Sequence, residues 1–205
     1  MKRKKILWLC SWYPNQLEPF NGDFIKRHAE AVALFCDIHI IHIARDIEGK
    51  ITKDVFEAND STRGFKEKII YYYIKLAGGK WIQQIQSHNK LYNLYKKEIK
   101  RYINEFGNPD LIHVHMGMKA GLAALWAKKQ FGINYVVSEH WSGFLEHASE
   151  KFEHTPNLFQ NAWKKILIGA VSVSAVSNTL ASSIKKIFPS ISPVVIPNVV
   201  NTDIF

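Results

Sequence analysis

The fold is decided by an N-terminal stretch in which two apolar runs flank one amphipathic segment. Residues 6–43 read ILWLCSWYPNQLEPFNGDFIKRHAEAVALFCDIHIIHI. The first run, residues 6–10, is apolar throughout, which is typical of a strand buried on both faces. Apolar side chains then recur at helical spacing over residues 22–35, and isoleucines dominate residues 38–43. The stretch predicts a strand–helix–strand unit, which builds a parallel sheet with a right-handed crossover.

The rest of the chain continues the alternation of apolar runs and helix-length segments. Further strands are predicted at residues 69–74, 110–115, 135–138, 170–175 and 194–196, and further helices at residues 80–106, 120–131, 158–168 and 178–188. Residues 45–68 are polar and lack a strong period, so we expect a loop excursion with short strands. The alternation predicts an α/β fold, a doubly wound parallel sheet with helices on both faces.

Composition limits the class of protein. The chain has 205 residues, of which 47% are hydrophobic, so we expect a real core and no extensive disorder. Its two cysteines exclude a disulfide framework and a four-cysteine zinc site. No transmembrane run is present and the apolar stretch after the basic start is too short for a signal peptide, so we expect a cytoplasmic protein. The net charge of +9 suits an anionic partner, such as nucleic acid, a membrane surface or a phosphorylated small molecule.

Candidate binding residues follow the predicted strands, because an open parallel sheet binds ligands at the carboxyl ends of its strands. The loop after the first strand brings Gly22 and Asp23 to a helix N-terminus, where backbone N–H groups can meet an anion. The chain holds neither G-x-G-x-x-G nor G-x-x-x-x-G-K-[ST] there, which argues against Rossmann dinucleotide binding and P-loop chemistry. An ordinary surface loop is the alternative interpretation.

Histidines stand at the ends of two later strands. His113 and His115 share one strand face, ahead of Gly117, and a metal bound by them would lack a third ligand nearby. His140 lies in the densest polar cluster, directly after Glu139, and histidine is the residue type that exchanges protons near neutral pH. The alternative for His140 is a buried histidine that only bonds a loop carbonyl. Neither interpretation is excluded by the residues themselves.

Five segments, in order along nearly the whole chain, resemble the N-terminal half of retaining GT-B glycosyltransferases of family 4. They read WYP…GDFIKRHAEA (residues 12–31), DLIHVH (110–115), EH (139–140), VS (176–177) and VIPNVVNTDIF (195–205). The family usually has a glycine where Val199 stands and an aspartate where Asn201 stands. It also usually has two adjacent glycines in the first loop, which here holds Gly22 alone.

The resemblance implies a Rossmann-like domain, one half of a GT-B fold. Residues 1–205 would be the acceptor-side domain, residues 197–205 would be the linker, and the donor-side domain would be absent. The implied reaction is retaining transfer, of hexosyltransferase type, from a nucleotide sugar to the hydroxyl of a sugar or lipid-linked acceptor in polysaccharide or glycolipid biosynthesis. No metal or other cofactor is implied, and this chain alone is expected to be inactive.

The resemblance also assigns roles to individual residues. His140 matches the histidine that hydrogen-bonds the transferred sugar, so it is the predicted catalytic residue. Ser177, which also suits a helix N-cap, and Asn198 match positions near the hinge. The predicted substrate-binding residues are Gly22, Asp23, His115, Gly117, Glu139, Ser177 and Asn198. Basic residues at positions 2–5 and 96–101 favour either peripheral contact with the inner face of the cell membrane or a solvated face.

Two other functions stay open. A non-enzymatic Rossmann-like module for a phosphorylated ligand is favoured by Val199 and by the missing glycine pair. A GT-B sugar-nucleotide epimerase would share the fold. We expect no nucleic-acid partner, because the positive charge is spread along the chain and no helix-turn-helix, RRM or zinc signature is present.

Overall fold

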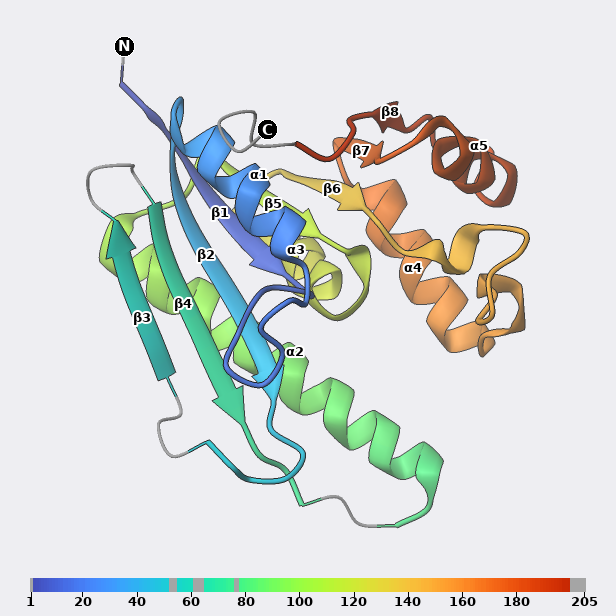
Figure 1. The fold of residues 1–205 in the computed structure, drawn as a ribbon, viewed down its shortest axis with the longest axis horizontal. Helices are drawn as coiled ribbons and strands as arrows, with labels where there is room; N and C mark the ends of the chain where they lie inside the picture. Colours follow the sequence, from blue (N-terminus) through green and yellow to red (C-terminus); the bar gives the residue numbers. More distant parts are fainter. Residues whose placement is uncertain (1, 52–54, 61–64, 76–77, 200–205) are drawn as a thin grey trace.

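A single eight-stranded sheet runs through the molecule (Figure 1). The computed structural model describes residues 2–51, 55–60, 65–75 and 78–199. The strands are β1 (Lys4–Cys10), β2 (Cys36–Arg45), β3 (Val55–Asp60), β4 (Phe65–Tyr72), β5 (Leu111–His115), β6 (Tyr135–Glu139), β7 (Ser172–Ala175) and β8 (Val194–Val195). Their order is β3-β4-β2-β1-β5-β6-β7-β8, and all neighbours are parallel except β3 and β4. The order reverses between β1 and β5, which opens a crevice at their carboxyl ends.

Helices cover both faces of the sheet, as the sequence predicts. They are α1 (Asp23–Ala33), α2 (Lys80–Phe106), α3 (Gly117–Phe131), α4 (Asn157–Gly169) and α5 (Asn178–Ile187). The alternation of side chains along β1 divides the core into two: Trp8 and Cys10 pack with α1, whereas Leu7 and Leu9 pack in the cluster that contains α2 and α3. The doubly wound, Rossmann-like arrangement is therefore confirmed. None of the described helices combines the length and the apolar character that a bilayer span requires.

The polar region between residues 45 and 68 is the main departure from the predicted elements. The short strand expected there is β3, which pairs antiparallel with β4 at the sheet edge, and β4 begins at Phe65, ahead of the predicted residue 69. The early part of β4 escapes prediction because it buries charges. Glu67 accepts from the Tyr13 hydroxyl and pairs with Lys26 at 2.9 Å, so its carboxylate is compensated on the α1 side of the sheet.

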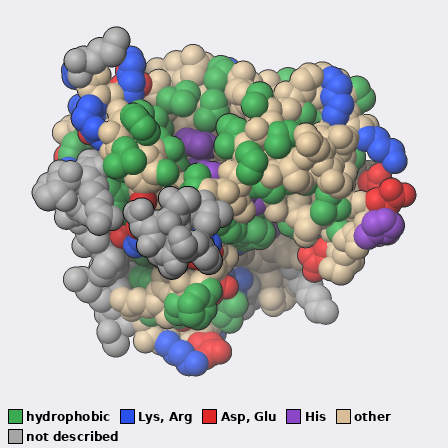
Figure 2. Space-filling view, turned by 45° about the horizontal axis from the view of Figure 1, so that its top comes forward, with side chains coloured by type: hydrophobic (Ala, Val, Ile, Leu, Met, Phe, Trp, Pro, Cys, Tyr) green, Lys and Arg blue, Asp and Glu red, His purple; other side chains and the backbone are tan. Residues whose placement is uncertain are grey.

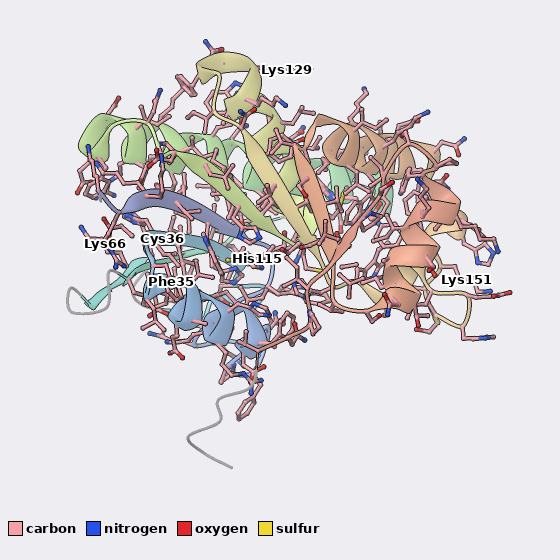
Figure 3. All side chains as sticks on the ribbon, turned by 90° about the horizontal axis from the view of Figure 1, so that it is seen from above. Phe35, Cys36, Lys66, His115, Lys129 and Lys151 are labelled. Atoms are coloured by element: carbon pink, nitrogen blue, oxygen red, sulfur yellow. The ribbon has the colours of Figure 1, made fainter. Side chains whose placement is uncertain are left out.

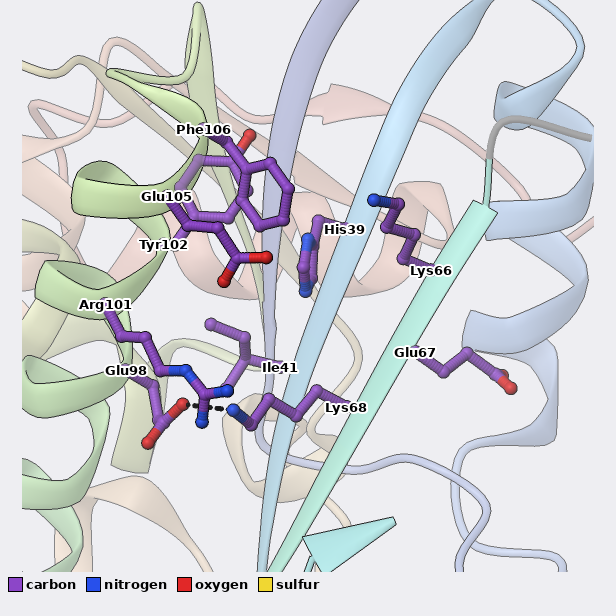
Figure 4. Close-up of a pocket in the computed structure, with 10 residues that line it drawn as sticks. All are labelled: His39, Ile41, Lys66, Glu67, Lys68, Glu98, Arg101, Tyr102, Glu105 and Phe106. Carbon is purple, nitrogen blue, oxygen red and sulfur yellow. Dashed lines mark ion pairs between the residues drawn. The ribbon is translucent and has the colours of Figure 1, made fainter. Parts of the chain in front are cut away.

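The second buried charge of β4 is compensated on the opposite side, against α2. The ammonium of Lys68 lies 2.9 Å from the carboxylate of Glu98, and both side chains are less than a tenth exposed. Figure 4 shows this pair in a cavity of about 220 Å³ whose lining includes His39 and Tyr102. The cavity lies beside the amino-terminal halves of β2 and β4, away from the end of the sheet where ligands bind.

Breaking the buried Lys68–Glu98 pair should destabilise the fold, because a single substitution would leave an unpaired charge in the interior. Glu98→Ala is expected to lower the free energy of unfolding by about 3 kcal/mol, because it removes the carboxylate opposite the buried Lys68 ammonium. The double variant Lys68→Met/Glu98→Leu should recover most of that loss. Urea unfolding measures both, with Glu48→Ala, which breaks an exposed pair, as the control. A loss for Glu98→Ala no larger than the control's contradicts this account.

Candidate functional site

A row of rings lies at the crevice between β1 and β5, and we call His28, His113, His115 and His140 the histidine row. The His115 ring lies 4.1 Å from both Trp8 and His113, measured between centroids. It is stacked at 6.0 Å and 18° on His140, which lies 6.5 Å from His28 of α1. Figure 3 labels His115 between the sheet and α1, and Figure 2 shows histidine side chains inside a hollow on one face.

Two members of the row have hydrogen-bond partners and two do not. The Nε2 atom of His113 lies 2.7 Å from the Ser138 hydroxyl, and Nε2 of His28 lies 3.3 Å from the Asn198 side-chain oxygen. Both ring nitrogens of His115 and of His140 are buried without a partner among the described residues. Buried polar atoms are normally satisfied, so these four nitrogens are exceptions within the described part of the chain.

The row is electrically neutral near pH 7. Burial lowers the pKa of His113 to about 3 and that of His140 to about 4, and neighbouring imidazoles add to both shifts. The pKa of His115 is also well below its usual value, again through burial. These imidazoles therefore act as neutral hydrogen-bonding groups. Among the described residues, no three His, Cys, Asp or Glu side chains group as metal ligands would.

Glu139 fixes the backbone next to the histidine row through hydrogen bonds. Its side chain is fully buried, and its two carboxylate oxygens accept from the backbone N–H groups of Gly117 at 3.1 Å and of His140 and Trp141 at 3.0 Å. Burial raises the pKa of this carboxyl to about 7 in spite of those bonds. The structure thus places Glu139, predicted to bind substrate, where it ties the end of β6 to the start of α3.

The two predicted glycines are required by the packing of the chain itself. Gly22 has φ 71°, and a Cβ there would lie 2.9 Å from the carbonyl carbon of Trp12. A Cβ on Gly117 would lie 2.4 Å from the Trp163 ring. Asp23 is exposed in the first turn of α1 and pairs with Arg27 at 2.8 Å. Ligand contact is therefore not needed to explain the glycines.

The two predicted residues near the hinge differ in their surroundings. Ser177 caps α5, where its hydroxyl accepts from the Leu180 N–H at 3.2 Å, which is the alternative that the sequence allowed. Asn198 joins the histidine row through His28, a residue that lies in a family-like segment but that we did not predict as a site residue. Residues 200–205, including Asn201 and most of the predicted linker, lie outside the described part of the chain.

A second feature that the sequence did not indicate is a cavity of about 630 Å³ at the carboxyl ends of β1, β2 and β4. Its lining includes Ser11, His42, Arg45 and Lys119. The turn formed by residues 116–119, which includes the start of α3, reaches it in a strained form, because Met116 and Lys119 have φ values of 64° and 66°. Ser11 holds that turn: its hydroxyl lies 2.8 Å from the Met116 carbonyl oxygen and also contacts that of Met118.

The fold and the position of these features define a GT-B glycosyltransferase domain, and comparison with known proteins agrees. The chain belongs to Glycosyltransferase Family 4, whose model matches residues 38–204. It is 29% identical over 192 residues to the teichuronic acid biosynthesis glycosyltransferase TuaC of Bacillus subtilis, covering 89% of this chain and 46% of that protein. The chain thus spans about half the length of this relative.

Solved structures match the same fold over about half of their own length. A sucrose-phosphate synthase from Thermosynechococcus elongatus superposes with a TM-score of 0.68 at 16% identity, covering 99% of this chain and 50% of that one. The catalytic domain of starch synthase IV from Arabidopsis thaliana, bound to ADP and acarbose, has a TM-score of 0.60 at 12% identity, covering 98% of this chain and 53% of that one.

The buried, unpartnered imidazole of His115 should make the protein sensitive to acid. The unfolded chain binds a proton near pH 6.5 and the folded chain does not, so folding loses stability as the pH falls below that value. We expect His115→Leu to remove about 2 kcal/mol of the stability loss between pH 7 and pH 5. Urea unfolding at the two pH values measures it, with the exposed His147→Leu as the control. An equal loss in wild type and His115→Leu contradicts the assignment.

Proposed function

We propose that this chain is the acceptor-side half of a retaining glycosyltransferase that moves a sugar from a nucleotide sugar to a hydroxyl acceptor in polysaccharide biosynthesis. The observation that carries the proposal is the histidine row, with four unpartnered ring nitrogens at the crevice of a family 4 domain. The names of its relatives support it: TuaC is a teichuronic acid biosynthesis glycosyltransferase, and the starch synthase domain holds ADP together with a sugar.

In this proposal each member of the row has a distinct task. His140 is the catalytic residue, and a ring nitrogen of His140 bonds a hydroxyl of the transferred sugar. Because its pKa is about 4, the ring stays neutral and serves as a hydrogen-bond partner. His115 is a positioning residue that stacks on His140, and Glu139 holds the backbone N–H of His140. Phe24, whose ring lies 4.7 Å from His140, would move aside to admit the sugar.

A donor-side domain completes the proposed enzyme, and the acceptor binds to this half. The chain spans about half of its relatives, so we infer that the other half binds the nucleotide and that this chain alone transfers no sugar. The loop at Gly22 and Asp23 faces the donor diphosphate across the crevice, where a helix N-terminus favours an anion. The proposal needs no metal, and it places the enzyme in the cytoplasm, where nucleotide sugars are the donors.

The alternatives from the sequence predict different behaviour towards the acceptor. A sugar-nucleotide epimerase would convert its nucleotide sugar without any acceptor present. A non-enzymatic binding module would leave the nucleotide sugar unchanged under all conditions. Family membership favours the transferase over both, and an assay of nucleoside diphosphate release with and without an acceptor separates the three.

The role of His140 is tested in the protein encoded by the complete reading frame. His140→Ala is expected to lower kcat about 100-fold, because it removes a hydrogen bond made to the reacting sugar in a water-poor site. Because this group titrates near pH 4, the rate of the wild type should not change between pH 6 and pH 8 through its protonation.

Two controls distinguish a catalytic role from a structural one. The exposed His154→Ala should keep the wild-type rate. His140→Ala should still unfold in one cooperative thermal transition, at a somewhat lower temperature, because the packing of the ring on Phe24 and His115 is lost but no hydrogen bond is. Wild-type activity in a folded His140→Ala protein would remove His140 from the mechanism. The absence of any sugar transfer by the complete protein, with a panel of nucleotide sugars, would remove the transferase itself.

A further inference from the structure

The proposed function places the acceptor in the cavity of about 630 Å³ at the strand ends, which we call the acceptor cavity. A second cavity opens directly beside it, between α2 and α3. It holds about 370 Å³, and we call it the apolar groove. His88, Leu91 and Lys119 line both the groove and the acceptor cavity, so the two spaces share a wall. The remaining groove lining is formed by Asn89, Tyr92, Met118, Leu122, Leu125, Trp126 and Lys129. Lys119 therefore borders both spaces.

The groove differs in chemistry from the acceptor cavity. Leu91 and Tyr92 of α2 face Leu122, Leu125 and Trp126 of α3. Leu91 is buried, and the other four side chains are partly exposed. The acceptor cavity instead presents charged and hydrogen-bonding groups at the strand ends. An apolar space joined to a polar one fits an amphiphilic ligand, whose hydrocarbon would lie in the groove and whose sugar would lie at the strand ends.

The helices around the groove are strongly basic. Between them, α2 and α3 carry Lys80, Lys90, Lys96, Lys97, Lys100, Arg101, Lys119, Lys128 and Lys129 against only Glu98 and Glu105. Glu98 is buried on the sheet side with Lys68. Lys96 lies 4.9 Å from the Trp126 ring centroid, and Lys100 lies 5.7 Å from it. No ion pair joins either lysine to a carboxylate in the described part of the chain, so the rim attracts anions.

Lys119 stands at the wall shared by the two cavities, in a backbone conformation that disfavours a side chain. Its φ is 66° and its ψ is −64°, a strained combination for a residue other than glycine. The Lys119 side chain lies where the sugar end of a ligand would join its apolar end, and burial of the ammonium lowers its pKa below the usual value.

We propose that the acceptor is a lipid-linked saccharide with a phosphate between its sugar and its hydrocarbon. The phosphate would pair with Lys119, the sugar would fill the acceptor cavity, and the first part of the hydrocarbon would lie along Trp126 in the apolar groove. The N-terminal bases are a poorer anion site, since Arg3 pairs with Asp37 at 2.6 Å and Lys4 with Asp110 at 3.1 Å. This inference rests on the proposed glycosyltransferase function and names its acceptor class.

Dodecyl phosphate, used below its micelle concentration, is the probe. By calorimetric titration of the 205-residue chain, it should bind at least tenfold more tightly than inorganic phosphate and at least tenfold more tightly than dodecyltrimethylammonium, which has the same hydrocarbon and the opposite charge. The first ratio reports the apolar groove and the second reports the cationic rim. Equal affinity for inorganic phosphate and dodecyl phosphate would mean that the site takes free phosphate, and would overturn the proposal.

Two variants and one control locate the site. Lys119→Gly removes the ammonium and relieves the backbone, so the fold should be kept while dodecyl phosphate binds at least tenfold more weakly. Trp126→Ala should weaken dodecyl phosphate binding, and Lys165→Ala, an exposed lysine on α4, should change nothing. Unchanged binding in both Lys119→Gly and Trp126→Ala would overturn the proposal, and retained binding to phosphatidylglycerol vesicles in those variants would assign the charge to a general membrane surface.

The outcomes for acceptor class and for reaction are separable. Binding of dodecyl phosphate needs no donor, so a complete protein that binds it at Lys119 but turns over no nucleotide sugar defeats the proposed function alone. A complete protein that transfers sugar to a soluble, uncharged acceptor, with the same kcat/KM in wild type and in Lys119→Gly, defeats the lipid-linked acceptor alone.

Discussion

The parallel pairing of β1 with β5 is the constraint on which the rest of the site depends. The two strands pair from Ile6 with Leu111 to Cys10 with His115, and the strand order reverses at this pair. The chain must leave the two strand ends in opposite directions, which opens the crevice. The Ser11 N–H extends the pairing by donating to the His115 carbonyl at 3.0 Å, and the Ser11 hydroxyl holds the strained turn before α3. This strand contact thus helps to position both the histidine row and the cavity at the strand ends.

The histidine row places unpartnered hydrogen-bonding groups in the interior and so lowers the stability of the folded chain. Neutral, buried imidazoles without partners are unfavourable, because their ring nitrogens lose hydration on folding and gain no hydrogen bond in return. The carboxylate of Glu139 is also costly to bury, and hydrogen bonds from three backbone N–H groups offset part of that cost. The groups that shape the crevice therefore lower the stability of the fold, and the hydrophobic clusters on the two sheet faces supply the stability that they lack.

Regular elements were predictable wherever local pattern and tertiary packing agree. The helix predicted at residues 80–106 is α2, and the predicted helix start at Ala120 falls where regular helical geometry resumes after Lys119. The sequence does not predict the start of β4, because Glu67 and Lys68 are residue types typical of the surface. Their burial is compensated by ion pairs with Lys26 and Glu98, which lie far away in the sequence. Glu139 was predicted at the right strand end, but its contacts are with its own backbone surroundings.

By itself, the sequence determined the alternating α/β fold and the strand ends at which polar groups gather, because hydrophobic period and turn residues are local signals. Through a family resemblance, the sequence also indicated His140 and Asn198 as candidate site residues. Only the tertiary structure decided which of these groups meet: His28 reaches Asn198, His115 stacks on His140, and Lys119 joins two cavities. These contacts arise between segments far apart in the chain, where packing and desolvation set the geometry and the pKa values, and no local pattern encodes them.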